Sequence, residues 1–198
     1  MRTLHLSPPD LLLPDNELIG RGPLTAIARF RGFATYRQAA TAVWQLPYGR
    51  NTSKGDLRLV LLEGRGTCST KHAFLRKLAE EQRLRVALVL AFYEMTEDNT
   101  PGVGRALEAH GVTSVLEAHC FLLYKGHMID LTSPPGSRAG RAKRFLRRKL
   151  ISAEQIGTHK EEQHKQALAE WIKTLPPPRP TEEEVWRIRE ACIAELSA

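Results

Sequence analysis

The stretch Gly64-Arg65-Gly66-Thr67-Cys68-Ser69-Thr70-Lys71-His72 decides the fold, because it leads a glycine-rich loop into an amphipathic helix. After Cys68, apolar residues recur at helical spacing with Lys and Glu between them, which predicts a helix to about Gln82 with one apolar and one wet face. Cys68 lies in the first turn, where free backbone N–H groups and the positive end of the helix dipole favour a thiolate. Gly64 and Gly66 would let a substrate backbone come close. The stretch therefore predicts a nucleophilic cysteine.

Length and composition limit the interpretation further. With 198 residues, 42% of them hydrophobic, the chain can bury one substantial core. No apolar run approaches the roughly 20 residues that span a bilayer, and the run Leu11-Leu12-Leu13 is cut short by Pro14. The three cysteines show no metal-binding spacing, so we expect reduced thiols, no metal, no cofactor and a cytoplasmic protein. The formal charge of +7 favours acidic partners but does not define a function.

The N-terminal third of the chain is predicted to form an arm followed by a helix. Residues 1–34 carry several prolines and glycines between apolar pairs, which predicts an extended arm laid over a core. Thr35 is a candidate N-cap for a helix that Pro47 and Gly49 end. The apolar run Leu57 to Leu62 fits either a short strand or a turn of helix.

Two segments in the middle of the chain are predicted to form a sheet. Leu84 to Tyr93 is a nearly continuous run of apolar and aromatic residues, typical of a strand that is buried on both faces. A hairpin follows, with one strand over Glu117 to Tyr124, a turn at Lys125-Gly126 and a second strand over His127 to Leu131. We therefore expect a central antiparallel sheet packed against the helix that begins at Cys68.

The C-terminal part is predicted to be helical throughout. A basic segment spans Arg141 to Leu150, and Thr158 with Glu161 forms the pattern of a capping box for a helix to Lys173. Thr181 with Glu184 repeats that pattern for the last helix. The predicted organisation of this α+β protein is an arm over 1–34, a catalytic core over 35–135 and a helical extension over 136–198, all in one globular unit.

The register of the hairpin places a histidine near a carboxylate. With a two-residue turn, Phe121 lies opposite Asp130, so His119 is on the same face as Asp130 and diagonal to it. At such a separation the carboxylate can accept a hydrogen bond from the imidazole. The predicted chemistry is that of a nucleophile, base and orienting acid: Cys68 attacks an acyl carbon, His119 pairs with the thiolate and protonates the leaving group, and Asp130 fixes the imidazole.

These motifs resemble the core of the transglutaminase-like superfamily. The resemblance rests on Gly66-Thr67-Cys68 at a helix start, His119-Cys120-Phe121 on a strand and Asp130-Leu131-Thr132 with Pro134 after the next strand, and it covers roughly residues 35–134. It implies a papain-like fold and cysteine-dependent acyl transfer from an amide to water or an amine, without a metal. Leu131 stands where that pattern often has a proline. The resemblance also implies an oxyanion donor upstream of the cysteine, for which Trp44 and Gln45 are the candidates.

Several other side chains compete for these roles. His72, four residues after Cys68, is an alternative base, although a local pair leaves no room for an acyl group. Glu117 is an alternative orienting acid. Cys120 is expected to point into the core. His159 and His164 are expected on the surface.

The basic residues between the predicted core and the last helices suggest a second hypothesis. These residues could bind a phosphate backbone or an acidic peptide. Aromatic residues for base stacking are absent, which makes nucleic acid the weaker choice. The preferred partner remains a peptide or other amide substrate of the predicted nucleophile. A third hypothesis is a catalytically silent scaffold of the same fold. The residues of this run are Arg138, Arg141, Lys143, Arg144, Arg147, Arg148 and Lys149.

Overall fold

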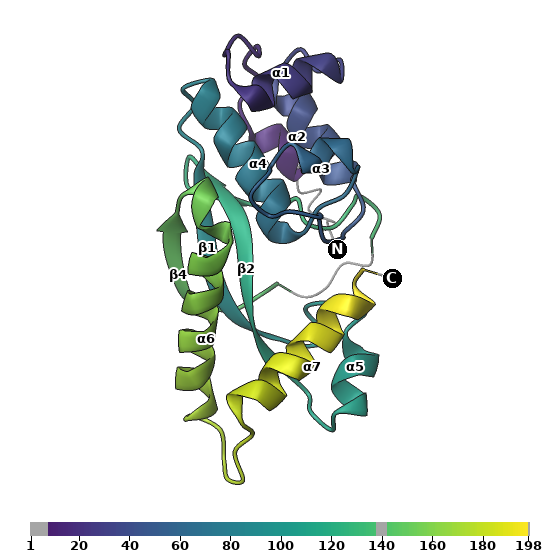
Figure 1. Cartoon of the computed structure of the whole chain (residues 1–198), viewed down its shortest axis with the longest axis vertical. Coiled ribbons are helices and arrows are strands. Elements are labelled where there is room, and N and C mark those ends of the chain that lie inside the picture. The colour runs from purple at the N-terminus through teal and green to yellow at the C-terminus, as the bar shows by residue number, and fades with distance from the viewer. Residues whose placement is uncertain (1–7, 138–141, 198) are drawn as a thin grey trace, which may run out of the picture.

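The computed structural model describes residues 8–137 and 142–197 (Figure 1). The helices are η1 (Pro9–Leu12), α1 (Pro23–Phe30), α2 (Tyr36–Gln45), α3 (Leu59–Leu62), α4 (Cys68–Glu81), α5 (Gly104–Ala109), η2 (Ala153–Ile156), α6 (Thr158–Ile172) and α7 (Glu182–Glu195). The strands are β1 (Ala87–Met95), β2 (Val115–Tyr124), β3 (His127–Ile129) and β4 (Phe145–Ile151). They form one antiparallel sheet in the order β3-β2-β1-β4.

Helix α4 begins at Cys68, as the sequence predicts, and Thr67 caps it. The Thr67 hydroxyl accepts a hydrogen bond from the Thr70 backbone N–H, and the Thr70 hydroxyl accepts one from the Thr67 backbone N–H. Gly66 is required here for packing within the chain rather than for a substrate, since a Cβ at this position would meet the Thr70 and Lys71 side chains at 3.0 and 2.9 Å. The close approach of loop and helix fixes where Cys68 lies.

The expectation of one wet face on α4 is wrong for its first half. All residues from Cys68 to Leu75 are buried, because α4 lies between helices α1–α3 and the sheet (Figure 1). The polar side chains of Lys71 and His72 in this stretch are fully buried and hydrogen-bonded. Their positions in the sequence have the spacing of a solvated face, and only the surrounding layers bury them.

The hairpin forms in the predicted register. Tyr124 pairs with His127 across a two-residue turn in which Lys125 and Gly126 have φ of 48° and 82°. Positive φ at both central positions is the turn geometry that matches the twist of a hairpin. Strand β3 ends at Ile129, two residues before the predicted end, so Asp130 stands where the chain leaves the sheet.

The strand predicted at Leu84 to Tyr93 is β1, shifted toward the C-terminus at Ala87–Met95. It lies at the centre of the sheet between β2 and β4. Leu88 and Leu90 belong to the main core, whereas Val89 and Ala91 join a smaller apolar cluster. The alternation shows that both faces of β1 are covered, as its continuous apolar run predicts.

Two expectations for the C-terminal part are wrong. The basic segment is no helix: it forms β4, which pairs antiparallel with β1 and completes the sheet. Its exposed cations suit an edge strand, where charge discourages pairing with another chain. Helix α6 starts without the predicted capping box, since its N-cap is Gly157 and no side chain caps it. The capping box at Thr181 and Glu184 does form at the start of α7.

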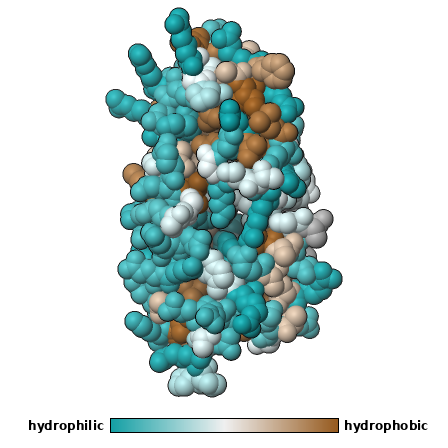
Figure 2. Space-filling model, viewed as in Figure 1, coloured by the Kyte–Doolittle hydropathy of each residue, from teal (hydrophilic) through white to brown (hydrophobic). Residues whose placement is uncertain are grey.

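The N-terminal region also differs from an extended arm. From residue 8 onward it contains η1 and α1, and the Glu81 carboxylate accepts hydrogen bonds from the backbone N–H groups of Leu24 and Thr25 in the first turn of α1. The ambiguous run near Leu57 resolves into helix α3, Leu59–Leu62. Among the described residues, no helix is both long and apolar enough to cross a membrane. The face drawn in Figure 2 is largely hydrophilic and is hollowed near its centre.

Candidate active site

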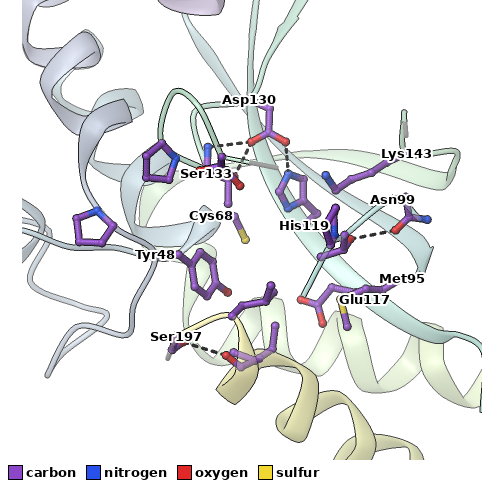
Figure 3. A pocket seen from close by; sticks show the side chains of 18 of the residues that line it. Tyr48, Cys68, Met95, Asn99, Glu117, His119, Asp130, Ser133, Lys143 and Ser197 are labelled. Carbon is purple, nitrogen blue, oxygen red and sulfur yellow. Dashed lines mark hydrogen bonds and ion pairs between the residues drawn. The ribbon is translucent and has the colours of Figure 1, made fainter. Parts of the chain in front are cut away.

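His119 and Asp130 make the contact that the hairpin register predicts. His119 Nε2 donates a hydrogen bond to Asp130 Oδ2 at 2.7 Å. This bond leaves the other ring nitrogen of His119 available, and Cys68 lines the same cavity as His119 and Asp130. Figure 3 shows the ring of His119 between the sulfur of Cys68 and the carboxylate of Asp130. The three candidate residues from α4, β2 and the end of β3 therefore meet in one site.

The second oxygen of Asp130 is held by the chain that follows it. Thr132 donates to Asp130 Oδ1 from its backbone N–H at 3.1 Å and from its hydroxyl at 2.5 Å. A carboxylate that is hydrogen-bonded at both oxygens keeps one orientation. The fixed carboxylate in turn holds the His119 ring in one orientation relative to Cys68.

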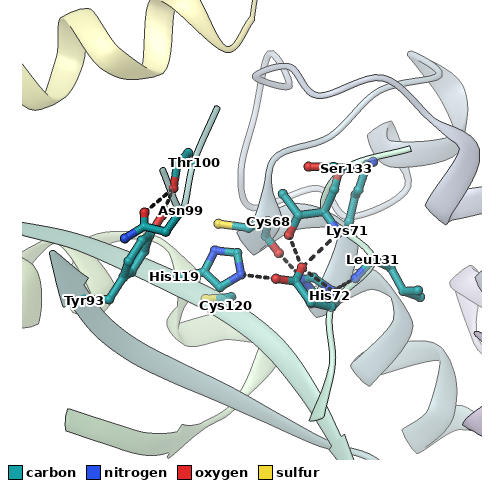
Figure 4. A network of polar contacts seen from close by, with 12 residues as sticks. Cys68, Lys71, His72, Tyr93, Asn99, Thr100, His119, Cys120, Leu131 and Ser133 are labelled. Carbon is teal, nitrogen blue, oxygen red and sulfur yellow. Dashed lines mark hydrogen bonds and ion pairs between the residues drawn. The ribbon is translucent and has the colours of Figure 1, made fainter. Parts of the chain in front are cut away.

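His72 has a structural role and is not the base. Its Nε2 accepts a hydrogen bond from the Leu131 backbone N–H at 2.8 Å, so the proton is on Nδ1, which donates to the Cys68 carbonyl oxygen at 2.7 Å. Burial, the largest influence, lowers the pKa of His72 to about 4. The neutral ring ties the start of α4 to the segment that carries Asp130 (Figure 4).

Lys71 ties the same segment from the other side. Its ammonium, fully buried, donates to the carbonyl oxygens of Leu46 at 2.6 Å and Thr132 at 2.8 Å. Burial lowers its pKa to about 8. Lys71 and His72, adjacent in the opening stretch, thus position Asp130 relative to Cys68.

The proposed oxyanion donors do not fit the structure. The Trp44 indole N–H lies at the cavity but already donates to the Ser133 carbonyl oxygen at 2.8 Å. Gln45 is exposed at the end of α2 and does not line the cavity beside Cys68. The donor at hand is Tyr48: its ring lies beside Cys68 with the hydroxyl directed into the cavity (Figure 3), and no described residue hydrogen-bonds to that hydroxyl. Tyr48 follows a Pro and precedes a Gly in the loop after α2, so the sequence gives no signal for it.

Glu117 is committed to an ion pair and does not orient His119. Its carboxylate, 4% exposed, accepts two hydrogen bonds from the Arg189 guanidinium at 2.7 and 3.0 Å. Burial opposes the charge, but Arg189 lowers the pKa of Glu117 to about 2. The pair joins β2 to α7 at the edge of the site.

Lys160 is a functional candidate that the sequence reasoning missed. It belongs to α6, is 9% exposed, and its Nζ donates to the Ser69 hydroxyl at 2.7 Å. Ser69 Oγ lies 3.8 Å from the Cys68 sulfur and 3.7 Å from the Cys120 sulfur. A buried ammonium therefore lies one hydroxyl away from the candidate nucleophile. The sequence gives one hint of a special role for Lys160: it lies in the first turn of a helix, where a cation is unfavourable.

The charges around the sulfur favour a thiolate and an imidazolium. Burial raises the pKa of Cys68, but the positive charges of the Lys160 ammonium and the His119 imidazolium lower it overall. Burial lowers the pKa of His119, but the Asp130 carboxylate and the Cys68 thiolate raise it overall. Both shifts favour a thiolate–imidazolium pair near neutral pH.

Two cavities meet at Cys68. The larger, about 700 Å³, lies on the side of His119 and is lined also by Tyr93, Met95 and residues 132–137. The smaller, about 300 Å³, lies on the side of Lys160. Cys68, Tyr48, Glu117 and Ile193 line both. A ligand that extends past the Cys68 sulfur can occupy both cavities.

The remaining candidate residues have structural places. Cys120 is fully buried in the core as predicted, and burial raises its pKa to about 11. His164 is not on the surface: it is 2% exposed and its Nε2 donates to the Leu116 carbonyl oxygen at 3.0 Å. His159 is partly buried. No cluster of three or more His, Cys, Asp or Glu side chains among the described residues could hold a metal ion.

Comparisons with known proteins leave the chain unassigned. No protein family, no curated protein and no solved structure matches it. The case for a function therefore rests on the geometry of the site.

Proposed function

We propose that this protein catalyses hydrolysis or acyl transfer at an amide bond through Cys68, His119 and Asp130, in the manner of the transglutaminase-like superfamily. The observation that carries the proposal is the alignment of a thiol at a helix N-terminus, an imidazole and a carboxylate from three different elements. The 2.7 Å hydrogen bond between His119 and Asp130 is one half of that alignment. The other half is the position of Cys68, at the start of α4, in the same cavity as His119 and Asp130.

In this mechanism the Cys68 thiolate attacks the acyl carbon, and the electron pair of the carbonyl moves to its oxygen. The tetrahedral intermediate collapses with cleavage of the C–N bond, and the amine leaves with the proton of the His119 imidazolium. His119, now neutral, takes a proton from water or from a second amine, which attacks the thioester and restores the thiolate. Asp130 keeps the imidazole oriented in both steps and does not itself become protonated.

The oxyanion of the tetrahedral intermediate needs hydrogen-bond donors. The Cys68 backbone N–H, in the first turn of α4, has no helical acceptor and supplies one. We propose the Tyr48 hydroxyl as the second donor, in place of Trp44 and Gln45. Burial and the neighbouring Cys68 raise the pKa of Tyr48, so its hydroxyl keeps its proton at neutral pH.

The test uses an activated ester, because the natural amide is unidentified. p-Nitrophenyl acetate should give a burst of one p-nitrophenolate per protein chain, with the acetyl group found on Cys68 by mass spectrometry. We expect Cys68→Ala and His119→Ala to lose the burst. Cys192→Ala, which removes another buried thiol, is the matched control and should keep it. A burst that survives in Cys68→Ala would refute the proposal.

The partner is a peptide or another amide, and a reducing, cytoplasmic compartment suits an active thiol. The alternative of a nucleic-acid surface has weaker support. Two cations of the basic run, Arg138 and Arg141, lie outside the described residues. The others lie on or just before β4, and one of them, Arg147, is ion-paired with Glu170 at 3.3 Å.

A further inference from the structure

The smaller cavity beside Cys68 carries more positive than negative charge once its internal ion pairs are set aside. Its charged lining residues come from β2, α6, α7 and the loop between α2 and α3. The cations are Arg50, Lys54, Lys160 and Arg189, and the carboxylates are Glu117, Glu161 and Glu190.

Every carboxylate of this cavity has a cationic partner. Glu117 is paired with Arg189, and Glu190 is paired with Arg50 at 2.6 Å and with Arg189. Glu161 is paired at 2.8 Å with Lys165 outside the cavity. Among the described residues, neither Lys54 nor Lys160 forms an ion pair with a carboxylate.

Of the two lysines, Lys160 needs a negative partner more strongly because its ammonium is buried. Of its three N–H donors, one is used by the Ser69 hydroxyl, and no other described acceptor bonds to it. In the resting enzyme the Cys68 thiolate balances its charge. When Cys68 forms a thioester, that negative charge disappears, and a buried ammonium without a counter-charge is destabilised. An anionic group of the substrate in the same cavity would restore the balance.

Lys54 stands at the exposed side of the same cavity. Desolvation of its ammonium lowers its pKa, and the positive charges of Lys160, Arg50 and Arg189 lower it further. Lysine side chains without a carboxylate partner among the described residues therefore line this cavity from the buried Lys160 to the exposed Lys54. The start of α6 at Gly157, which no side chain caps, faces the same space.

We propose that this cavity, with Lys160 at its floor and Lys54 at its mouth, binds an anionic group of the substrate next to the bond that Cys68 attacks. The ligand class is an oxyanion, either a carboxylate or a phosphoryl group. The inference rests on the proposed function, because it assigns a specificity to the same nucleophile.

The test compares two alkylating reagents of nearly equal size, the anionic iodoacetate and the neutral iodoacetamide. In both reactions the thiolate forms a C–S bond at the methylene carbon, the C–I bond breaks and iodide leaves. Iodoacetamide reports the reactivity of the thiolate in each variant, so the ratio of the two rates isolates the effect of the negative charge. Mass spectrometry assigns each rate to Cys68.

We expect the rate ratio of iodoacetate to iodoacetamide to fall about tenfold in Lys54→Gln, the change that loss of one hydrogen bond to a charged group produces. Lys160→Gln should show a similar fall, while Lys54→Arg keeps the charge and should keep the ratio. Lys173→Gln is the control for net charge, since Lys173 is exposed at the far end of α6. A ratio unchanged in Lys54→Gln would overturn the inference, even if Lys160→Gln fails to fold.

Competition then identifies the anion. Acetate that slows alkylation of Cys68 more than inorganic phosphate does points to a carboxylate, and the reverse order points to a phosphoryl group. The outcome is separable from that of the proposed function. If the ratio stays constant while iodoacetamide still reports a thiolate near neutral pH, the anion site fails and the catalytic proposal stands. If no such thiolate exists, the catalytic proposal fails.

Discussion

Two cations from distant parts of the chain, His119 on β2 and Lys160 on α6, lower the pKa of Cys68 against the effect of burial. The N-terminus of α4 carries a partial positive charge, which also stabilises the Cys68 thiolate. Burial opposes these three contributions, because desolvation destabilises the charged form of the Cys68 thiol. The balance decides whether Cys68 is a reactive thiolate or an inert core residue.

Removing the charge of Lys160 tests its share in this balance. Lys160→Met should raise the pKa of Cys68 by about one unit, because a nearby opposite charge stabilises the thiolate by an amount of this order. The pH dependence of the iodoacetamide rate measures the shift. Lys165→Met is the matched control, since Lys165 is an exposed lysine on the same helix. Equal midpoints in the two variants would show that Lys160 does not act on the sulfur.

Asp130 is tested by removing its charge while keeping its shape. Asp130 and Cys68 together raise the pKa of His119 to about 9. Asp130→Asn should move the loss of the imidazolium to lower pH, toward the ordinary histidine pKa of about 6.5. The NMR titration of the His119 ring measures this shift. An unchanged midpoint in Asp130→Asn would contradict an ion pair between His119 and Asp130.

At the scale of elements, the β2–β3 hairpin brings His119 to Asp130. The contact depends on a turn of two residues, because a single inserted residue changes which face each side chain occupies. The hairpin could be predicted from sequence since a Gly at the turn and the flanking apolar strands are local signals. Gly126, at φ 82°, takes a conformation that suits glycine.

Insertion of one glycine between Lys125 and Gly126 should therefore separate His119 from Asp130 without unfolding the protein. We expect the alkylation rate of Cys68 to titrate closer to an ordinary thiol in this variant. Lys125→Asn is the control: it keeps a two-residue turn of a favoured Asn-Gly type and should keep the wild-type titration. Wild-type behaviour after the insertion would mean that the register does not set the site.

Other elements could not be predicted locally, and the reason is their tertiary pairing. Strand β4 has the composition of a solvated basic helix, and only the open edge of β1 makes it a strand. Lys71 and His72 have the spacing of a wet helix face, yet the layers around α4 bury them. The candidate triad residues were predictable because their motifs are local, whereas Lys160 and Tyr48 reach the candidate site through long-range packing.

At the scale of the whole molecule, the C-terminal helices complete the site. Helix α6 supplies Lys160, and α7 supplies Arg189, which neutralises the buried Glu117. The core over residues 35–135 therefore lacks part of its electrostatic environment without the residues that follow it. The extension is part of the candidate active site as well as a cover for the sheet.

Breaking the ion pair between β2 and α7 should destabilise the fold. Arg189→Met leaves the Glu117 carboxylate buried without a partner, and loss of one partner from a buried pair costs about 3–5 kcal/mol of unfolding free energy. Urea denaturation measures the loss. Arg187→Met, two residues away on the same helix and exposed, is the control and should stay within about 0.5 kcal/mol of wild type. Equal losses in both variants would show that the pair does not stabilise the fold.

The central claim is that Cys68 is a thiolate paired with His119 near neutral pH. The measurement that tests it most directly is the rate of alkylation of Cys68 by iodoacetamide as a function of pH, in the wild type and in His119→Ala. The wild-type rate should rise with a midpoint of about 6, the lowered pKa of Cys68, and the midpoint in His119→Ala should move toward the ordinary thiol value of about 8.5. A midpoint near that ordinary value in both proteins would contradict the ion pair and, with it, the proposed catalysis.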